Sequence, residues 1–358
     1  YFFKLRIVLK KYSEGMDKMK LMRTEDAVGQ VLCHDITQII KGVTKDAVFR
    51  KGHIITEEDI PVLLSVGKDH IYIWENNENM LHENDAAKIL YDMCANEHMT
   101  PSEIKEGKIE LIAECDGLLK VDTERLNAVN ALGEMMIACR HGNFPVKKGD
   151  KIAGTRIIPL VIEKEKMERA KKLAGEEPIF ELIPFKKMKA AIVNTGNEVF
   201  YGRIKDTFTP VIIEKLKEYG AEVVGHVVSD DNHEHITAAI QKFLDEGVDM
   251  VLCTGGMSVD PDDRTPLAIK NTGAEIVTYG APVLPGAMFL LSYYGEKKRP
   301  VIGLPGCVMY AKRTIFDLVL PRIVAGEILK KADVDTLGEG GLCLNCPVCT
   351  FPNCGFGK

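Results

Sequence analysis

Glycine-rich and acidic turns follow four short apolar runs in the second half of the 358-residue chain. They read NTGNE (194–198), SDDN (229–232), TGGMSVDPDD (254–263) and GLPG (303–306). Glycine lets backbone N–H groups approach an anion closely, and a helix that follows adds its partial positive charge. Gly255 and Gly256 with Ser258 therefore predict a phosphate cradle, and Pro305 and Gly306 predict a second, rigid turn. The alternative is that these glycines serve only the tight turns of the fold.

Acidic residues crowd two of these turns, namely Asp230, Asp231, Asp260, Asp262 and Asp263. Carboxylates beside a phosphate repel it unless a divalent cation lies between them, and Mg²⁺ prefers oxygen ligands of this kind. The acids therefore predict Mg²⁺ at the turns. An N-cap role for Asp263, ahead of a helix starting near Thr265, stays open beside this hypothesis.

Short strands alternating with helices place the four turns. From Lys189 the strands are KAAIVNTG, AEVVGHVVSD, VDMVLCTGG, EIVTYG and PVIGLPG, and the helices are TPVIIEKLKEYG, NHEHITAAIQKFLDEG, PLAIKNTG and AKRTIFDLVLPRIVAG. The first two helices should bury Ile212, Leu216, Tyr219, Ile236, Ile240 and either Phe243 or Leu244. This alternation predicts a mostly parallel sheet with helices on both faces. Ligands bind such sheets beyond the carboxyl ends of the strands, where the four turns lie.

The first half of the chain is less regular. We expect an upstream extension over 1–15, because the first methionine is Met16, a small domain over 16–75, and a mixed α/β-rich domain and linker over 76–186. TEEDIPVLLSVGK predicts a helix with Thr56 as N-cap, and HIYIW (70–74) predicts a strand. KIELIAECDGLLKVD predicts two strands around an Asp-Gly turn, and the charged run 163–178 predicts a solvated helix and linker.

Composition excludes several classes of protein. With 46% hydrophobic and 27% charged residues the chain should not be disordered. No apolar run approaches the roughly 18 to 20 residues of a membrane span, and no secretory signal is evident. The net charge of −6 gives no global signature of nucleic-acid binding. Ten cysteines without a signal peptide indicate reduced thiols in the cytoplasm.

Four of these cysteines gather in the cysteine-rich tail, residues 331–358. Cys343, Cys346, Cys349 and Cys354 have the spacing C-x2-C-x2-C-x4-C. Thiols this close favour tetrahedral Zn²⁺ or an iron–sulfur cluster over disulfides in a reducing compartment. The alternative is a redox-labile tail without metal.

The order TGNE, SDD, TGGMSVDPDDRTP and GLPG resembles the molybdopterin-binding domain of molybdopterin molybdotransferases and adenylyltransferases, over about 187–326. The region 20–75, with EDAVGQVLCHDIT and KGHIITEEDIPVLLSVGKDHIYIW, is similar to the first domain of the molybdotransferases. The resemblance implies a three-layer α/β/α molybdopterin-binding domain over 187–330, preceded by smaller α+β or β-rich domains. It also implies a homo-oligomer.

The resemblance assigns roles to residues of the turns. The acids at the active centre would be Glu198, Asp230, Asp231 and Asp263. Contacts to molybdopterin or its adenylate would come from Thr195, Gly196, Thr254, Gly255, Gly256, Ser258, Pro305 and Gly306. The cations near the turns that could hold molybdate are Arg264, Lys312 and Arg313.

The implied function lies in molybdenum cofactor biosynthesis. The leading hypothesis is a molybdotransferase-like enzyme that inserts molybdate into adenylated molybdopterin and displaces AMP. The segment GGMSV resembles the molybdotransferases and DRTP the adenylyltransferases, so an adenylyltransferase using ATP and Mg²⁺ stays open. A non-catalytic molybdopterin carrier or sensor is the third hypothesis. Partners would be molybdopterin, molybdate, and molybdoenzymes or other cofactor-biosynthesis proteins, with no nucleic acid and no membrane.

Overall fold

The computed structural model describes residues 20–40, 44–73, 79–258, 260–261 and 263–358. The expected extension 1–15, Trp74 and Asp262 lie outside these residues. The chain forms two compact units. Unit 1 comprises Tyr1–Glu114, Val121–Arg140 and Asp150–Glu181, and unit 2 comprises Cys115–Lys120, His141–Gly149 and Leu182–Lys358.

Unit 1 is built from small antiparallel sheets and short helices. Its helices are η1 (Thr24–Asp26), α2 (Asp59–Ser65), α3 (Glu83–Asp92), α4 (Thr123–Asn130) and α5 (Lys164–Ala174). Its strands are β1 (Lys20–Arg23), β2 (Ile36–Ile40), β3 (Thr44–Phe49), β4 (His70–Ile73), β5 (Met80–His82), β6 (Met99–Pro101), β7 (Lys108–Ala113), β9 (Met135–Cys139), β11 (Lys151–Ile157) and β12 (Val161–Glu163). β6, β7, β11 and β9 form one four-stranded sheet in that order.

One local prediction in unit 1 is wrong. Thr56 does not cap α2, which begins at Asp59 after Glu58 and has no side-chain cap. Instead Thr56 Oγ1 donates to Asp59 Oδ2 at 2.9 Å, and the Thr56 backbone N–H donates to the same oxygen at 2.8 Å. The acid therefore closes a turn ahead of the helix, so the helix starts two residues later than expected. The end of the helix agrees with expectation, because Gly67 follows it at a φ of 78°.

Unit 2 holds most of the regular structure of the second half. Its helices are α6 (Asn197–Phe200), α7 (Phe208–Lys217), α8 (His233–Asp245), α9 (Thr265–Asn271), η2 (Gly306–Met309), α10 (Ile315–Ala325), α11 (Lys331–Asp335) and η3 (Thr336–Gly338). Its strands are all or most of β8 (Gly117–Val121), β10 (Phe144–Val146), β13 (Phe180–Pro184), β14 (Lys189–Thr195), β15 (Glu222–Ser229), β16 (Met250–Thr254), β17 (Glu275–Tyr279), β18 (Leu290–Tyr294) and β19 (Arg299–Leu304).

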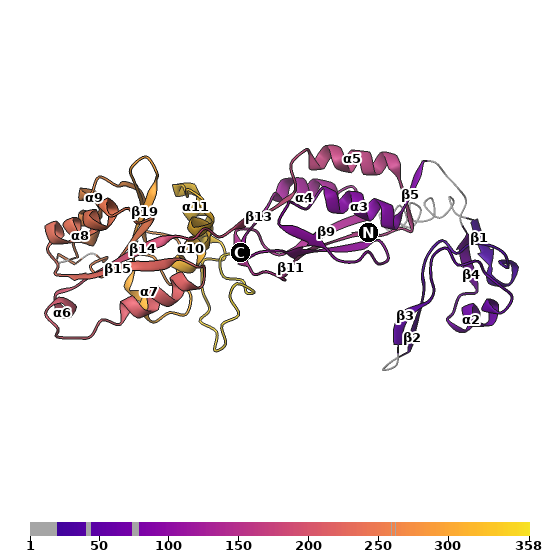
Figure 1. Ribbon diagram of the computed structural model, residues 1–358, viewed down its shortest axis with the longest axis horizontal. Helices are drawn as coiled ribbons and strands as arrows, with labels where there is room; N and C mark the ends of the chain where they lie inside the picture. The colour runs from indigo at the N-terminus through magenta and orange to yellow at the C-terminus, as the bar shows by residue number, and fades with distance from the viewer. Residues whose placement is uncertain (1–19, 41–43, 74–78, 259, 262) are drawn as a thin grey trace, which may run out of the picture. The chain divides into compact units, whose positions relative to one another are not determined.

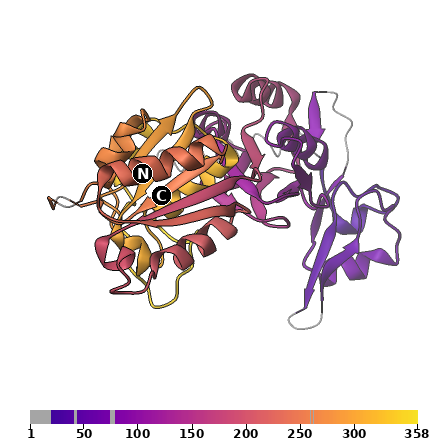
Figure 2. The same ribbon diagram turned by 60° about the vertical axis from the view of Figure 1, so that its left-hand side comes forward.

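A six-stranded sheet forms the centre of unit 2, in the order β15-β14-β16-β19-β18-β17. The first four strands are parallel, and β18 runs antiparallel to both of its neighbours. Figure 1 shows α8 and α9 over one face of this sheet and α7 and α10 over the other. The same three layers are visible in the turned view of Figure 2. The predicted α/β/α architecture is confirmed.

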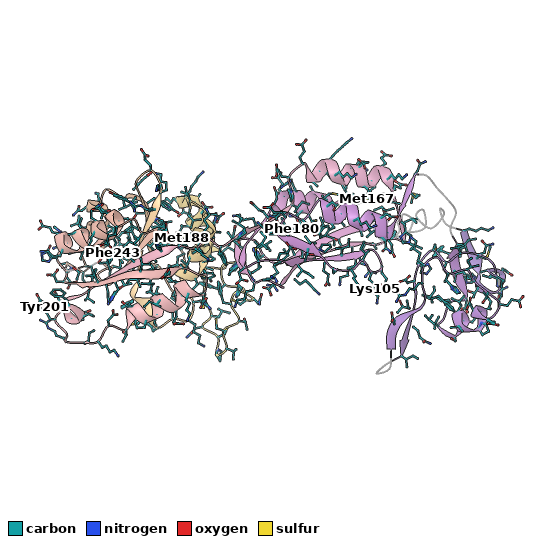
Figure 3. All side chains as sticks on the ribbon, in the orientation of Figure 1. Lys105, Met167, Phe180, Met188, Tyr201 and Phe243 are labelled. Atoms are coloured by element: carbon teal, nitrogen blue, oxygen red, sulfur yellow. The ribbon has the colours of Figure 1, made fainter. Side chains whose placement is uncertain are left out.

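Side chains of neighbouring residues in each strand enter different cores, as the two-residue period of a strand requires. In β14, Ala190 and Ile192 pack with α7 and α10, whereas Ala191 and Val193 pack with α8 and α9. Because both faces are covered, the strand is apolar without a break, as expected of a parallel sheet. Figure 3 marks Phe243 of α8, whose ring lies so close over β15 that only a glycine, Gly225, fits beneath it.

The apolar spacing that predicted the buried faces of α7 and α8 is confirmed, but one strand of the six-stranded sheet was not predicted. The five residues expected to be buried without an alternative are buried, and so are both Phe243 and Leu244. The missed strand is β18, which lies between β17 and β19. β7 and β8 both form as predicted around the Asp-Gly turn, but they join different sheets, because β8 pairs with β10 and β13.

Candidate active site at the carboxyl edge of the sheet

The four predicted turns meet at one edge of the sheet. Thr195, the last residue of β14, pairs with Ser229, the last residue of β15. Asn194 pairs with Thr254 at the end of β16, and Thr254 pairs with Leu304 at the end of β19. Because these strands are parallel and end in register, the turns that follow them are neighbours in space.

A hydrogen-bonded threonine pair joins the first and third turns. Thr195 Oγ1 donates to Thr265 Oγ1 at 3.1 Å and also lies 3.2 Å from the Thr254 carbonyl oxygen. Thr265 Oγ1 donates to the Gly255 carbonyl at 2.8 Å. All three threonines are at most 3% exposed. This buried pair fixes the backbone of the candidate phosphate cradle before any ligand arrives.

Two glycines at the cradle are required by the backbone. Gly255 and Gly256 have φ angles of 84° and 56°, in the left-handed region that favours glycine. A Cβ at Gly255 would lie 2.1 Å from the Thr195 carbonyl oxygen, and one at Gly256 would lie 2.9 Å from Thr265 Oγ1. The first and third turns therefore touch through backbone, which leaves no room for a side chain between them.

The predicted acids of the first two turns lie beside one another. The Asn197 N–H donates to Asp231 Oδ2 at 3.0 Å, which ties the turn after β14 to the turn after β15. Asp230 lies 3.0 Å from His235 Nδ1, on the first turn of α8. Glu198 is exposed, and its carboxylate folds back over Gly196, where an added Cβ would lie 2.7 Å from Glu198 Oε1. The acids thus line a polar rim, with Asp231 held in place and Glu198 open to solvent.

Asp263 belongs to the loop between β16 and α9. Its backbone N–H donates to the Asp260 carbonyl at 2.9 Å, which closes a turn. α9 begins at Thr265 after Arg264 and has no side-chain cap, so the N-cap alternative for Asp263 is wrong. Tyr279 of β17 donates its hydroxyl to the Met257 carbonyl at 2.8 Å. Burial, followed by the negative charge of Asp263, raises the pKa of Tyr279, so this hydroxyl keeps its proton.

The fourth turn forms a stiff wall. Pro305 is buried and accepts a hydrogen bond from the Val308 N–H at 3.0 Å, and Gly306, which is exposed, begins η2. Ser258 is exposed on the adjoining loop, next to Met257, which is 4% exposed. The Met257 side chain fills the space over Gly303, where a Cβ would lie 2.4 Å from its Cε. Gly303 of β19 thus lets the cradle loop, the segment between β16 and α9, pack against the sheet.

Two of the three candidate molybdate-binding cations have other partners. Arg313 forms ion pairs with Glu218 at 2.7 Å and with Asp317 at 2.9 Å. Lys312 Nζ donates to the carbonyls of Cys346 at 2.9 Å and Pro347 at 2.8 Å. Arg264 is exposed on the cradle loop itself.

Sequence reasoning missed a polar cluster beside the edge. Asp206 accepts hydrogen bonds from the backbone N–H of Thr209 at 3.1 Å and from its hydroxyl at 2.6 Å. Thr209 Oγ1 also lies 3.0 Å from His226 Nε2, on β15. Partial burial alone would raise the pKa of Asp206, but the hydrogen bonds from Thr209, Asn194 and Phe208 together hold the pKa below its usual value. The three-residue spacing from Asp206 to Thr209, just ahead of α7, is the capping signal that could have identified this acid.

The four cysteines of the tail are all free thiols, with Cys346 and Cys349 exposed and the other two half-buried. Within the described ranges, no group of three or more His, Cys, Asp or Glu side chains is arranged to hold a metal ion. The predicted metal ligands are therefore close in sequence but not preformed as a coordination shell.

The sheet order defines an open α/β domain in which the four parallel strands end at one polar edge. Residues 191–325 match the family described as "Probable molybdopterin binding domain", and residues 21–75 match "Domain of unknown function (DUF8806)". Residues 191–325 thus form a molybdopterin-binding domain of the family found in molybdenum cofactor biosynthesis proteins, which confirms the resemblance seen in the turns.

Curated relatives match the same part of the chain. A molybdopterin molybdenumtransferase of Synechococcus elongatus is 28% identical over 163 residues, 43% of this chain and 38% of the relative. A CinA-like protein of Mycobacterium avium is 34% identical over 90 residues, 25% of this chain and 21% of the relative. The chain therefore spans less than two fifths of the length of these relatives.

Among solved structures, the molybdopterin biosynthesis enzyme MoaB from Thermus thermophilus is similar, with 23% identity and a TM-score of 0.32. The match covers 40% of this chain and 99% of that protein. In the part of the chain that the structure describes, no helix is long and apolar enough to cross a bilayer.

Proposed function

We propose that the protein binds molybdopterin or its adenylate at the carboxyl edge of the β15-β14-β16-β19 strands and inserts molybdate into it, as a molybdotransferase-like enzyme. The observation that carries the proposal is the backbone contact of Gly255 with Thr195, held by the Thr195–Thr265 hydroxyl pair. The contact places a left-handed glycine pair at the sheet edge, where its N–H groups would be suited to bind a phosphate.

The reaction would have two balanced parts. Molybdate exchanges one oxo ligand for the two sulfurs of the dithiolene, and the two thiol protons leave with that oxygen as water. Water hydrolyses the anhydride bond between the pterin phosphate and AMP, and the oxygen of this water becomes part of the AMP phosphate. The protein would contribute preorganised N–H donors at Gly255 and Gly256, which stabilise charge on the phosphate without moving.

The acids of the edge would serve to hold a cation and to orient water. Mg²⁺ in proteins is often held by one or two carboxylates together with substrate phosphates. Asp231 and Asp263, on the turns after β15 and β16, have the donor chemistry for such shared ligation. When bound, the ion would neutralise phosphate charge. Glu198 and Asp230, both at the rim, are the further candidates for handling a proton.

A coupled assay tests the insertion activity. Purified protein is mixed with adenylated molybdopterin, molybdate and Mg²⁺, and both AMP release and active cofactor are measured. The proposal predicts that both products form together and that omission of molybdate abolishes cofactor formation. Binding of the adenylate without AMP release would refute insertion.

A second candidate function is that of a molybdopterin carrier or sensor. It is favoured by the engagement of Lys312 and Arg313 with other groups, which leaves Arg264 of the cradle loop as the candidate cation that could still hold molybdate. A carrier needs the phosphate cradle but no oxyanion site for molybdate. Tight binding that is indifferent to molybdate would support this function, and ATP-dependent transfer of AMP to molybdopterin would instead support the adenylyltransferase.

The ten free thiols support our expectation that the protein works in the reducing cytoplasm. We expect a homo-oligomer and transient contact with molybdoenzymes or other cofactor-biosynthesis proteins. Size-exclusion chromatography with light scattering tests the first expectation, and a monomer at all concentrations would refute it.

A further inference from the structure

The four tail thiols share one cavity with two cations. A cavity of about 210 Å³ in unit 2 is lined by Cys343, Cys346, Cys349 and Cys354 together with Lys312 and Arg313. All four cysteines of the cysteine loop, residues 343–354, thus border a common space. Nothing in the reaction proposed for the sheet edge uses these thiols.

Both ends of the cysteine loop are anchored to the core of unit 2. The Cys343 N–H donates to the Leu284 carbonyl at 2.8 Å. Cys343, Phe351 and Cys354 pack against the main hydrophobic core, and Phe356, just beyond the loop, is 4% exposed. The first and last thiols are therefore fixed by packing, while Cys346 and Cys349 lie exposed on the segment between them.

The cavity is also electrostatically matched to an anionic centre. Four thiolates around a divalent metal carry a net charge of about −2, and soft metals are the ions that prefer such ligands. Lys312 is held at the cavity by its hydrogen bonds to Cys346 and Pro347, and the Arg313 guanidinium lies 4.9 Å from the centre of the Phe351 ring. Lys312 would offset part of the charge of the complex, whereas Arg313 is already paired with Glu218 and Asp317.

We propose that Cys343, Cys346, Cys349 and Cys354 form a four-thiolate site for a soft metal centre, either one Zn²⁺ or one iron–sulfur cluster, with Lys312 as its charge partner. In the described part of the chain the thiols do not yet form a coordination shell. Closure requires the two exposed thiols to swing into the cavity that their loop already borders. Cys343 and Cys354 need not leave the core.

The test measures metal in the full chain purified without oxygen. Elemental analysis and visible absorption distinguish the two centres, since zinc gives about one ion per chain and no colour, whereas a cluster gives several irons with inorganic sulfide and a visible band. Either result supports the site. Absence of metal, both as purified and after incubation with Zn²⁺ or with iron and sulfide, overturns it.

Cysteine variants distinguish a specific metal site from metal that is bound non-specifically. Cys346→Ser with Cys349→Ser should lose the metal without unfolding, because both side chains are exposed. The matched control is Cys139→Ser, an exposed thiol of unit 1 that should keep it. Alkylation mapping adds a readout independent of variant folding, because all four tail thiols should be protected until a chelator or an iron-releasing oxidant is added. Metal retained by the double variant, or tail thiols that alkylate in metal-loaded protein, would overturn the site.

Discussion

Gly255→Ala is the sharpest perturbation of the candidate site. The added Cβ would lie 2.1 Å from the Thr195 carbonyl oxygen, about 1.3 Å short of the 3.4 Å at which ordinary contact begins. The obstacle is backbone, so no side chain can rotate away to relieve it. The turns after β14 and β16 must therefore separate, which displaces the predicted phosphate cradle.

A second glycine provides a control, because a side chain added there would have the same backbone strain but no steric clash. Gly273, after α9, has the same φ of 84°, and an added Cβ there would have nothing within 4 Å. Gly273→Ala should cost about 1–2 kcal/mol of unfolding free energy from left-handed strain alone. Gly255→Ala should cost a further 1–3 kcal/mol or so for the overpacked contact. A displacement of this size at a reacting group lowers turnover on the order of 100-fold.

Two measurements compare the Gly255→Ala and Gly273→Ala variants. Hydrogen exchange across a urea series gives the unfolding free energy of the peptides covering β14 and β16, and titration gives the affinity for molybdopterin. We expect Gly255→Ala to lose both stability and affinity and Gly273→Ala to lose only a little stability. Equal destabilisation by the two variants with equal affinity would refute the argument that the close backbone contact builds the site.

Three further predictions concern single side chains. Asp263→Asn should leave the fold intact and abolish AMP release, because it removes a charge needed beside the phosphate; unchanged turnover would remove Asp263 from the site. Tyr279→Phe should cost about 1 kcal/mol from the lost hydrogen bond to Met257 and weaken ligand binding by loosening the cradle loop, and unaltered affinity would contradict this. Burial, only partly opposed by Arg156, raises the pKa of Glu83 to about 7. The folded state then binds the extra proton, so stability should fall as pH rises from about 4.5 to 7, and Glu83→Gln should flatten that dependence in urea unfolding.

Much of the fold of unit 2 was predictable because its signals are local and repeated. The apolar periods of α7 and α8 identified their buried faces, and unbroken apolar strands indicated a sheet covered on both sides. β18 was missed although Gly295 follows it, because its place between β17 and β19 depends on long-range pairing. Thr56 was misassigned because its hydroxyl donates to the Asp59 carboxylate instead of accepting from a backbone N–H of the helix.

The candidate site was predictable as a set of turns but not as a set of contacts. Glycines and acids after strands mark an edge, so the grouping of Gly255 with the turn after β14 follows from topology. The Thr195–Thr265 pair could not be foreseen, since it joins residues 70 positions apart. The position of Arg313 also depends on long-range pairing, because Glu218 and Asp317 come from two different helix ends.

Hydrogen exchange with and without bound molybdopterin tests the central claim most directly, because it locates the ligand without requiring turnover. The account predicts that the ligand slows exchange in the peptides covering 194–198, 229–232, 254–258 and 303–306 together, and leaves unit 1 unchanged. Protection confined to other segments, or no protection at saturating ligand, would contradict a pterin site at the carboxyl edge of this sheet.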